Sequence, residues 1–169
     1  IPEATRFALT SSQVQSLNVS ETGLKPLSAG QRSELSDEQA QSLNYREFER
    51  LSPQQTPLLT AEQLSTVPNS WWFGRLSDDA QSVLTAAQVQ ALRVEHLGLS
   101  GLTPIQRAVL ALDQIQSLGF RDFEHLNEAQ TPLLTGAQVA TIPNSWWFGR
   151  MSVEARAAIT PEQVQQLNV

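Results

Sequence analysis

Two identical segments, PNSWWFGR at 68–75 and at 143–150, carry the residue types best suited to binding a ligand or a partner. Each segment combines a pair of adjacent tryptophans with an arginine. These residues are Trp71, Trp72 and Arg75 in the first copy and Trp146, Trp147 and Arg150 in the second. An exposed indole beside a guanidinium suits stacking on a sugar ring or gripping a side chain of a protein partner. They are therefore the candidate platform for a glycan or a protein.

A structural role for the same tryptophans is the competing interpretation, in which they fill a wide corner of the core. Neighbouring helical positions project in different directions, which allows one tryptophan of each pair to be buried and the other exposed, and the sequence does not decide which of the two it is. We also expect the asparagine and serine of each segment to cap a helix, and Gly74 or Gly149 to permit a left-handed exit from it.

Residues suited to catalysis do not occur in a matched pattern. The two histidines, His96 and His125, stand 75 residues after Glu21 and Arg50, so neither histidine recurs. No nucleophile and base are spaced as a pair. Four carboxylates fall in the first turns of predicted helices, where the helix dipole favours them; they are Asp37, Glu38, Asp78 and Asp79. The sequence therefore predicts no enzyme, no cofactor and no metal site.

Composition narrows the class further. The chain has 169 residues and a net charge of −6, which argues against nucleic acid as a partner. Apolar residues make up 40 % of it, too many for a typical disordered segment. No apolar run approaches the roughly 18 residues of a membrane span, so we expect no membrane insertion. The absence of cysteine excludes disulfides and cysteine-based zinc sites.

The chain is built from a repeat of 75 residues. Residues 20–94 align with 95–169 without a gap and share 38 identities, and residues 1–19 continue the pattern by matching 76–94. We therefore predict a single array over 1–169, made of a partial repeat (1–19) and two full repeats (20–94 and 95–169). Both ends cut a repeat at unequal points, so we expect a longer parent protein.

A shorter period lies inside the long one. Leucine or an apolar substitute recurs every eight to ten residues, at 27, 35, 43, 51, 59, 67, 76, 84, 92 and 102. Grouped in threes, these steps predict coils of about 25 residues, each with three sides and with the leucines pointing inward at the corners. The Trp-Trp-Phe segments fall on the third side. Ten of the eleven aromatic residues do so, and Phe7 is the exception.

Helices are predicted by a capping pattern within the eight-residue unit. Serine or threonine precedes glutamine by three residues at 10/13, 28/31, 36/39, 52/55, 60/63, 85/88, 103/106, 135/138 and 160/163, and Asn127/Gln130 is similar. This is the capping box, in which hydroxyl and glutamine side chain bond each other's backbone N–H groups. Because each box starts a new helix, no helix should exceed about seven residues, and such short helices need neighbours to be stable.

Position six of each unit predicts which sides face the core. On the second side it is apolar, at Val14, Ala40, Leu64, Val89, Ile115, Val139 and Val164. On the first side it is polar, at Arg6, Arg32, Thr56, Gln81, Arg107, Thr131 and Arg156. We therefore expect the second side to be buried and the first to face water. Arg32 and Arg107 are a second exposed candidate surface, for which solvated charge is the simpler explanation.

These patterns together predict an all-α fold, a solenoid or superhelix of short capped helices with about 25 residues per coil and a 75-residue super-repeat. Seven coils at ordinary helix spacing would give a rod of roughly 60–70 Å. Contacts would join neighbouring coils only, and open ends would expose core, which allows end-to-end self-association.

The units LTSSQVQSL (9–17), LTAAQVQAL (84–92) and ITPEQVQQL (159–167) resemble the tandem Leu-Thr-Pro-x-Gln-[Ile/Val]-x-x-Leu repeats of very large secreted bacterial surface proteins, including adhesin-like ones. In that family the repeats look like extended spacer or stalk modules. The resemblance implies a spacer or adhesive scaffold in a bacterial extracellular or cell-surface protein. The alternative is a binding module whose Trp-Trp-Phe segments take a glycan or a protein partner.

Two further resemblances concern the fold. LTAEQLSTVPNSWW (59–72) is similar to the Leu-Ser-x-Glu-x-Leu-x-x-Val-Pro segments of the mesothelin and stereocilin superhelices, which are built of short stacked helices. The unit also resembles the opening of TAL-effector repeats, Leu-Thr-Pro-x-Gln-Val. Here, however, the period is 25 rather than 34, the base-reading loop is missing and the charge is negative, so DNA binding is not implied.

Overall fold

Short helices are the only regular elements in the part of the chain that the computed structural model describes, residues 9–167. None of these helices exceeds six residues, as the capping pattern predicts. No strand occurs between residues 9 and 167, so the all-α prediction is confirmed. Phe7, Arg6 and the beginning of the predicted partial repeat lie outside the described residues.

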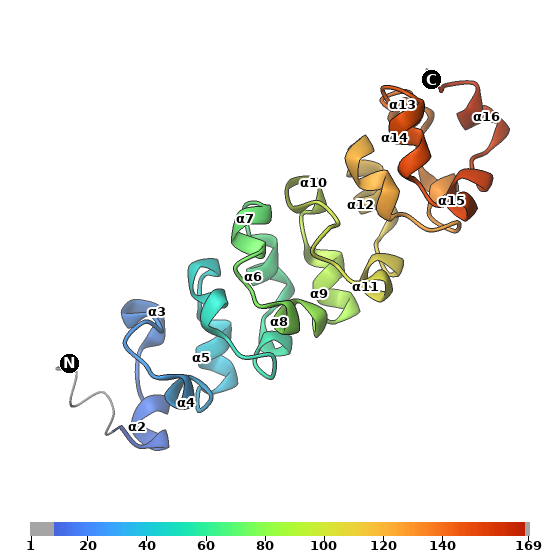
Figure 1. The fold of residues 1–169 in the computed structure, drawn as a ribbon. Coiled ribbons are helices and arrows are strands. Elements are labelled where there is room, and N and C mark those ends of the chain that lie inside the picture. The colour runs from blue at the N-terminus through green and yellow to red at the C-terminus, as the bar shows by residue number, and fades with distance from the viewer. Residues whose placement is uncertain (1–8, 168–169) are drawn as a thin grey trace. The chain divides into compact units, whose positions relative to one another are not determined.

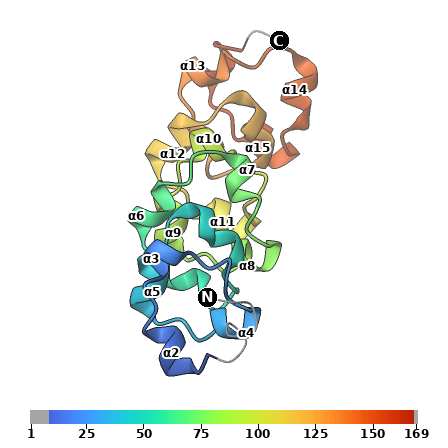
Figure 2. The same cartoon turned by 90° about the vertical axis from the view of Figure 1, so that its left-hand side faces the viewer.

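The chain divides between Leu92 and Arg93 into two compact units, which are described separately. The helices of the N-terminal unit are α2 (Ser11–Gln15), α3 (Val19–Thr22), α4 (Ala29–Arg32), α5 (Asp37–Gln41), η1 (Tyr45–Arg50), η2 (Thr56–Leu58), α6 (Ala61–Ser65), α7 (Ser70–Phe73), α8 (Asp78–Ser82) and α9 (Ala86–Ala91). In Figure 1 and Figure 2, α2, α5, α6 and α9 follow one another along one side of this unit.

The C-terminal unit repeats this order of elements. Its helices are α10 (Val94–Leu97), α11 (Pro104–Ala108), α12 (Leu112–Ser117), η3 (Phe120–His125), η4 (Thr131–Leu133), α13 (Gly136–Val139), α14 (Ser145–Arg150), α15 (Val153–Ala157) and α16 (Pro161–Val164). In both units, helices of successive stretches of chain pack together: α5 against η2 and α6 against α9 in the first, and α12 against η4 and α13 against α16 in the second.

The predicted capping boxes start most of the helices. In α6, for example, the Gln63 N–H donates to Thr60 Oγ1 (3.1 Å) and the Thr60 N–H donates to Gln63 Oε1 (2.9 Å). The same reciprocal pair begins α2, α4, α5, α9, α11, α13 and α16. Asn127 and Gln130 form it too. Ser52 and Gln55 do not, because the Gln55 N–H donates to the Ser52 carbonyl instead of the hydroxyl.

The capping glutamines also make a second set of bonds that the sequence did not reveal. The Gln63 Nε2 group donates to the carbonyls of Ala40 (3.0 Å) and Leu43 (2.8 Å), at the end of α5. Gln39, Gln88, Gln138 and Gln163 donate in the same way to carbonyls 20 to 32 residues earlier, and Gln55 and Gln130 each reach one. Each such glutamine therefore joins its own helix to the end of an earlier one.

Burial follows the apolar pattern closely. All ten corner positions from Leu27 to Leu102 are buried, as predicted. The second-side residues are buried from Val14 to Val139, but Val164 is 53 % exposed. Among the described residues α16 is the last helix, so no following helix covers Val164. The prediction for Val164 is therefore wrong for a simple reason of position.

The prediction that the first side faces water is also wrong. Thr56 and Thr131 are completely buried and Gln81 is 7 % exposed, whereas Arg32, Arg107 and Arg156 are partly buried. The threonines tolerate burial because each hydroxyl donates to the carbonyl four residues earlier, that of Ser52 or Asn127. Gln81 donates to the carbonyls of Phe73 and Leu76.

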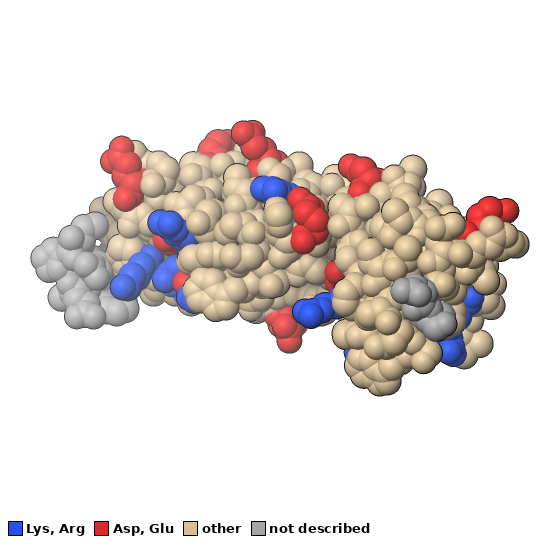
Figure 3. Space-filling model, turned by 90° about the horizontal axis from the view of Figure 1, so that it is seen from above, with Lys and Arg blue, Asp and Glu red and all other residues tan. Residues whose placement is uncertain are grey.

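Charged side chains are spread thinly over the face that Figure 3 shows. Figure 3 shows acidic and basic residues in small groups with uncharged surface between them. Asp37 and Glu38 lie in the first turn of α5, and Asp78 and Asp79 in that of α8, as predicted. Within residues 9–167, no helix has the length and apolarity needed to cross a membrane.

Candidate functional site

The two Trp-Trp-Phe segments form short helices, α7 and α14, that begin in the same way. The N-cap residues Asn69 and Asn144 accept a hydrogen bond from the N–H of Trp72 and Trp147, each at 3.2 Å. Asparagine suits this position because its side-chain oxygen replaces the missing helical acceptor. The capping role predicted for the segment is confirmed for asparagine.

The first tryptophan of each pair is exposed. Trp71 is 60 % and Trp146 is 61 % exposed, whereas Trp72 and Trp147 are partly buried. The two rings of each pair nevertheless touch edge to face, with centroids 4.6 Å apart in the first copy and 4.8 Å in the second. Each pair is therefore divided into an exposed and a less exposed tryptophan, as the sequence allowed, but the two rings form one connected surface.

An aromatic residue from an earlier element supports each pair. Tyr45, the first residue of η1, packs edge to face on Trp72 with centroids 5.2 Å apart. Phe120, the first residue of η3, makes the same contact with Trp147 at 5.1 Å. This contact fixes the inner tryptophan and leaves the outer one to solvent.

An arginine covers each tryptophan pair. The Arg75 guanidinium carbon lies 4.9 Å from the Trp71 ring centre and 5.4 Å from that of Trp72. Arg150 lies 5.1 and 5.4 Å from the rings of Trp146 and Trp147. These are cation–π distances.

Each arginine is also paired with a carboxylate. Arg75 binds Glu49, and Arg150 binds Glu124. The hydrogen bond from Arg150 lowers the pKa of Glu124, and the same bond raises the pKa of Arg150. The platform is consequently close to neutral.

Sequence reasoning found the tryptophans and arginines of this cluster but missed Glu49 and Glu124. Both glutamates are identical in the two repeats and precede their arginine by 26 residues, which is close to one predicted coil. That spacing was the available signal. This spacing becomes informative only when residues about one predicted coil apart are considered as contact partners.

The predicted left-handed role of Gly74 and Gly149 is wrong. Gly74 has a φ of −67°, and Gly149 lies within α14 without a positive φ. In the described chain, positive φ occurs at Gly23 (66°) and its repeat partner Gly98 (71°). These glycines precede Leu24 and Leu99, whose N–H groups donate to the carboxylates of Glu47 and Asp122.

The other candidates do not assemble into a site. Arg32 is partly buried and donates to the Leu27 carbonyl (2.7 Å), and Arg107 is partly buried as well, so neither is the exposed residue that the pattern suggested. His96 is exposed beside Arg93, and burial lowers the pKa of His125. Within residues 9–167, no three His, Asp or Glu side chains are grouped as metal ligands.

Comparison with known proteins gave no relative from which a function could be transferred. No family model, no curated protein and no solved structure matches the chain. The chemistry of the cluster must therefore be judged from its own geometry. It presents an exposed indole beside an arginine that is paired with a glutamate, which suits contact with a ligand or a partner.

Proposed function

We propose that the chain is an α-solenoid with about 25 residues and three sides per coil, repeated as a 75-residue unit, and that it acts as a non-enzymatic structural scaffold. The observation that supports this best is the bonding of the capping glutamines. Each ties the start of its helix to the end of a helix one coil earlier, so contacts join neighbours in sequence order.

The resemblance to tandem repeats of large secreted bacterial proteins supports a setting for this scaffold. On that basis we place it in an extracellular or cell-surface adhesin-like protein of a bacterium, where it serves as a spacer. A spacer must be stiff and must be able to repeat. Hydrogen bonds between a glutamine amide and backbone carbonyls, recurring along the array, favour both properties.

Deletion of one repeat tests the scaffold. Removing residues 20–94 joins Val19 to Glu95, and Val19 is the repeat partner of Val94, so the register is preserved. We expect a folded protein with the same helical circular dichroism per residue and a shorter maximum dimension by X-ray scattering. Loss of helical signal would instead indicate a closed globular domain.

Binding through the tryptophan platform is a second function, and one observation favours it. A spacer has no need of exposed indoles, yet Trp71 and Trp146 are each about 60 % exposed at equivalent positions. Large exposed aromatics next to arginine are typical of contact sites for partners. The ligand would be a glycan or a protein that stacks on the indole face.

Acrylamide quenching of tryptophan fluorescence tests the exposure on which this second function depends. The Trp71→Phe/Trp146→Phe variant should lose most of the quenchable emission, and the Trp72→Phe/Trp147→Phe variant should keep it. If all four tryptophans were equally protected from acrylamide, an exposed tryptophan platform would be excluded and the spacer function would be the only proposal left.

A further inference from the structure

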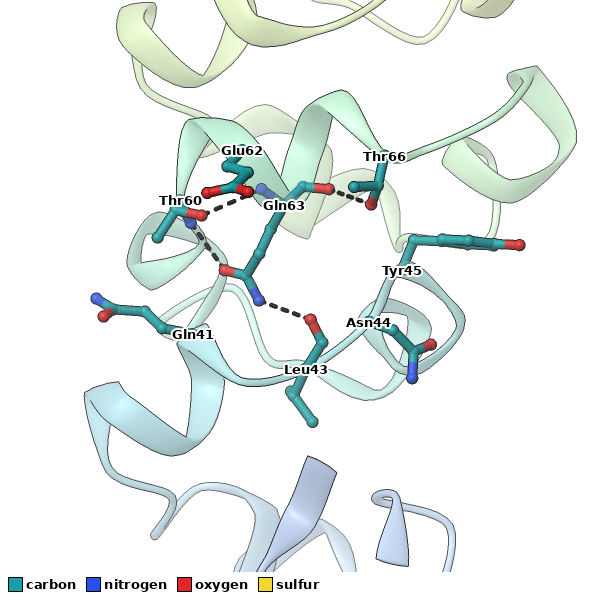
Figure 4. Close-up of a pocket in the computed structure, with 8 residues that line it drawn as sticks. All are labelled: Gln41, Leu43, Asn44, Tyr45, Thr60, Glu62, Gln63 and Thr66. Atoms are coloured by element: carbon teal, nitrogen blue, oxygen red, sulfur yellow. Dashed lines mark hydrogen bonds between the residues drawn. The ribbon is translucent and has the colours of Figure 1, made fainter. Parts of the chain in front are cut away.

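A pocket lined mainly by polar residues lies beside the tryptophan platform in the N-terminal unit, and Tyr45 belongs to both. It is a cavity of about 660 Å³, formed where the chain leaves α5 and enters η1, opposite α6. Its rim carries the side chains of Gln41, Asn44, Tyr45, Glu62 and Thr66. Figure 4 shows Gln41 on one side of the pocket and Asn44 and Tyr45 on the other, with Gln63 between them.

The floor of this pocket is rigid. Gln63 caps α6 through its Oε1 atom and donates from Nε2 to the carbonyls of Ala40 and Leu43 (Figure 4). Tyr45 is held from outside by its edge-to-face contact with Trp72. A site built on fixed groups binds a small ligand without first having to order itself.

The rim, in contrast, has hydrogen-bonding capacity that the fold does not use. Among the described residues, none forms a hydrogen bond with the side chains of Gln41 or Glu62 or with the Tyr45 hydroxyl. Asn44 uses its Oδ1 atom to accept from the Arg46 N–H (3.0 Å). The rim therefore offers amide donors and acceptors, a carboxylate and a phenol within one cavity.

The C-terminal unit keeps the frame of this pocket, including the equivalents of Gln41 and Thr66, but lacks three of its polar groups. Gln138 makes the same bonds as Gln63, to the carbonyls of Ile115 and Leu118. However, Asn44, Tyr45 and Glu62 are replaced at the equivalent positions, and the replacements are Gly119, Phe120 and Ala137. Phe120 still contacts Trp147 as Tyr45 contacts Trp72, so packing does not require the tyrosine hydroxyl.

We propose that the pocket of the N-terminal unit binds a neutral, hydroxyl-rich pyranose sugar, and that its counterpart in the C-terminal unit does not. A sugar ring presents hydroxyls that pair with amides, a carboxylate and a phenol, and C–H groups that pack on an aromatic ring. No lysine or arginine lines the cavity and Glu62 does, which disfavours an anionic ligand. Binding here does not require the exposed Trp71 or Trp146, neither of which lines the pocket.

The decisive experiment exchanges the pocket residues between the repeats. The full chain is screened on an array of neutral glycans, and the best neutral oligosaccharide is titrated by calorimetry. In the variant Asn44→Gly/Tyr45→Phe/Glu62→Ala, which carries the residues of the C-terminal unit, we expect affinity to fall at least about tenfold. Thermal unfolding should remain cooperative, since the same residues stand in a folded unit.

The reciprocal variant, Gly119→Asn/Phe120→Tyr/Ala137→Glu, should bind two sugars per chain instead of one. Position 119 accepts a side chain, because its φ is −86° and a Cβ there would meet no atom within 4 Å. Three results would overturn the proposal: no neutral glycan bound by the wild type, unchanged affinity in the first variant, or preference for sialylated over neutral glycans.

A Trp71→Ala/Trp146→Ala variant separates this site from the platform. If this variant binds the oligosaccharide with the affinity of the wild type, the exposed tryptophans are not the binding site and the pocket is supported. If it abolishes binding while the pocket variant does not, the platform is the binding site and the pocket proposal is wrong.

Discussion

A single glutamine side chain solves two problems that short helices create. A helix leaves its first N–H groups and its last carbonyls without partners, and a helix of four to six residues consists of little else. The amide oxygen of Gln63 accepts from a backbone N–H at the start of its own helix, and the amide nitrogen donates to carbonyls at the end of an earlier helix. Glutamate could only accept, and lysine could only donate, which explains why this position favours glutamine.

The two roles of Gln63 can be separated by mutation. Thr60→Ala removes one capping bond and should lower the free energy of unfolding by about 1 kcal/mol. Gln63→Ala also leaves the carbonyls of Ala40 and Leu43 without donors, so a loss of about 2–4 kcal/mol is expected. Urea denaturation measures both, with Gln54→Ala, an exposed glutamine outside any box, as the control. Equal losses for Thr60→Ala and Gln63→Ala would contradict the dual role.

The partly buried carboxyl of Asp122 makes stability depend on pH. Burial raises its pKa, although the hydrogen bond from the Leu99 N–H acts in the opposite direction. A carboxyl with a raised folded-state pKa holds its proton more tightly when folded, so stability is lost as pH rises through the unfolded and then the folded pKa.

The Asp122→Asn variant cannot ionise, and its amide oxygen can still accept from Leu99. We therefore expect the stability of this variant relative to wild type to rise between about pH 3 and pH 6. Denaturant unfolding of both proteins at several pH values measures the difference. A relative stability that falls over this range would show that the hydrogen bond outweighs burial.

Residue-scale features were predictable where they are local. A capping box lies within four residues, and eight of the nine serine or threonine boxes form as predicted. The donation from Gln63 to Ala40 and the burial of Thr56 were not predictable in this way. The first spans 23 residues, and the second depends on a backbone carbonyl that satisfies a hydroxyl inside the core.

At the scale of elements, the turns after α3 and α10 are fixed by glycine. Gly23 and Gly98 adopt positive φ, and a Cβ at Gly23 would lie 3.1 Å from Glu47 Oε1. A side chain at this position is therefore strained by its backbone and pressed against the carboxylate that accepts from Leu24.

Gly23→Ala should lower the free energy of unfolding by about 1–2 kcal/mol, because alanine disfavours left-handed backbone. The matched control is Gly30→Ala within α4, where a Cβ would meet no atom within 4 Å and alanine should be neutral or stabilising by up to about 1 kcal/mol. Thermal unfolding compares them. A loss at Gly30 equal to that at Gly23 would mean that φ is not the cause.

The candidate site was predictable as a set of residue types but not as an arrangement. The repeated Trp-Trp-Phe segment stands out in the sequence, but the sequence left open whether its tryptophans are exposed. The support from Tyr45 and the pairing of Arg75 with Glu49 were missed because both partners come from η1, an earlier element of the chain. Contacts of that kind require knowledge of which positions of successive coils meet.

For the molecule as a whole, the boundary between the two compact units nearly coincides with the boundary between the two sequence repeats. The units separate after Leu92, two residues before the repeat boundary at 94/95. Each unit has its own buried residues, such as Leu64 and Phe48 in the first and Ile115 and Phe123 in the second. Each therefore has the means to fold independently.

A fragment of residues 93–169 should accordingly show helical circular dichroism and a cooperative thermal transition, with a midpoint below that of the full chain. Such a lowering is expected because a smaller array has fewer neighbour contacts per residue. Circular dichroism of the purified fragment measures it, with the 1–92 fragment for comparison. A fragment without a transition would contradict independent folding.

The glutamine bonds also bear on how such a chain lengthens during evolution. The acceptors are backbone carbonyls, which every residue supplies. The bond from a glutamine therefore does not require a particular side chain in the neighbouring segment. Unequal crossing-over can then insert or remove whole units, and each new junction finds a compatible partner without compensating substitutions. Half the positions of the two repeats have since changed while the donors Gln63 and Gln138 stayed the same. The glutamine-to-carbonyl bonds can thus connect units of different sequence. Substitutions at other positions can therefore give individual units different surfaces.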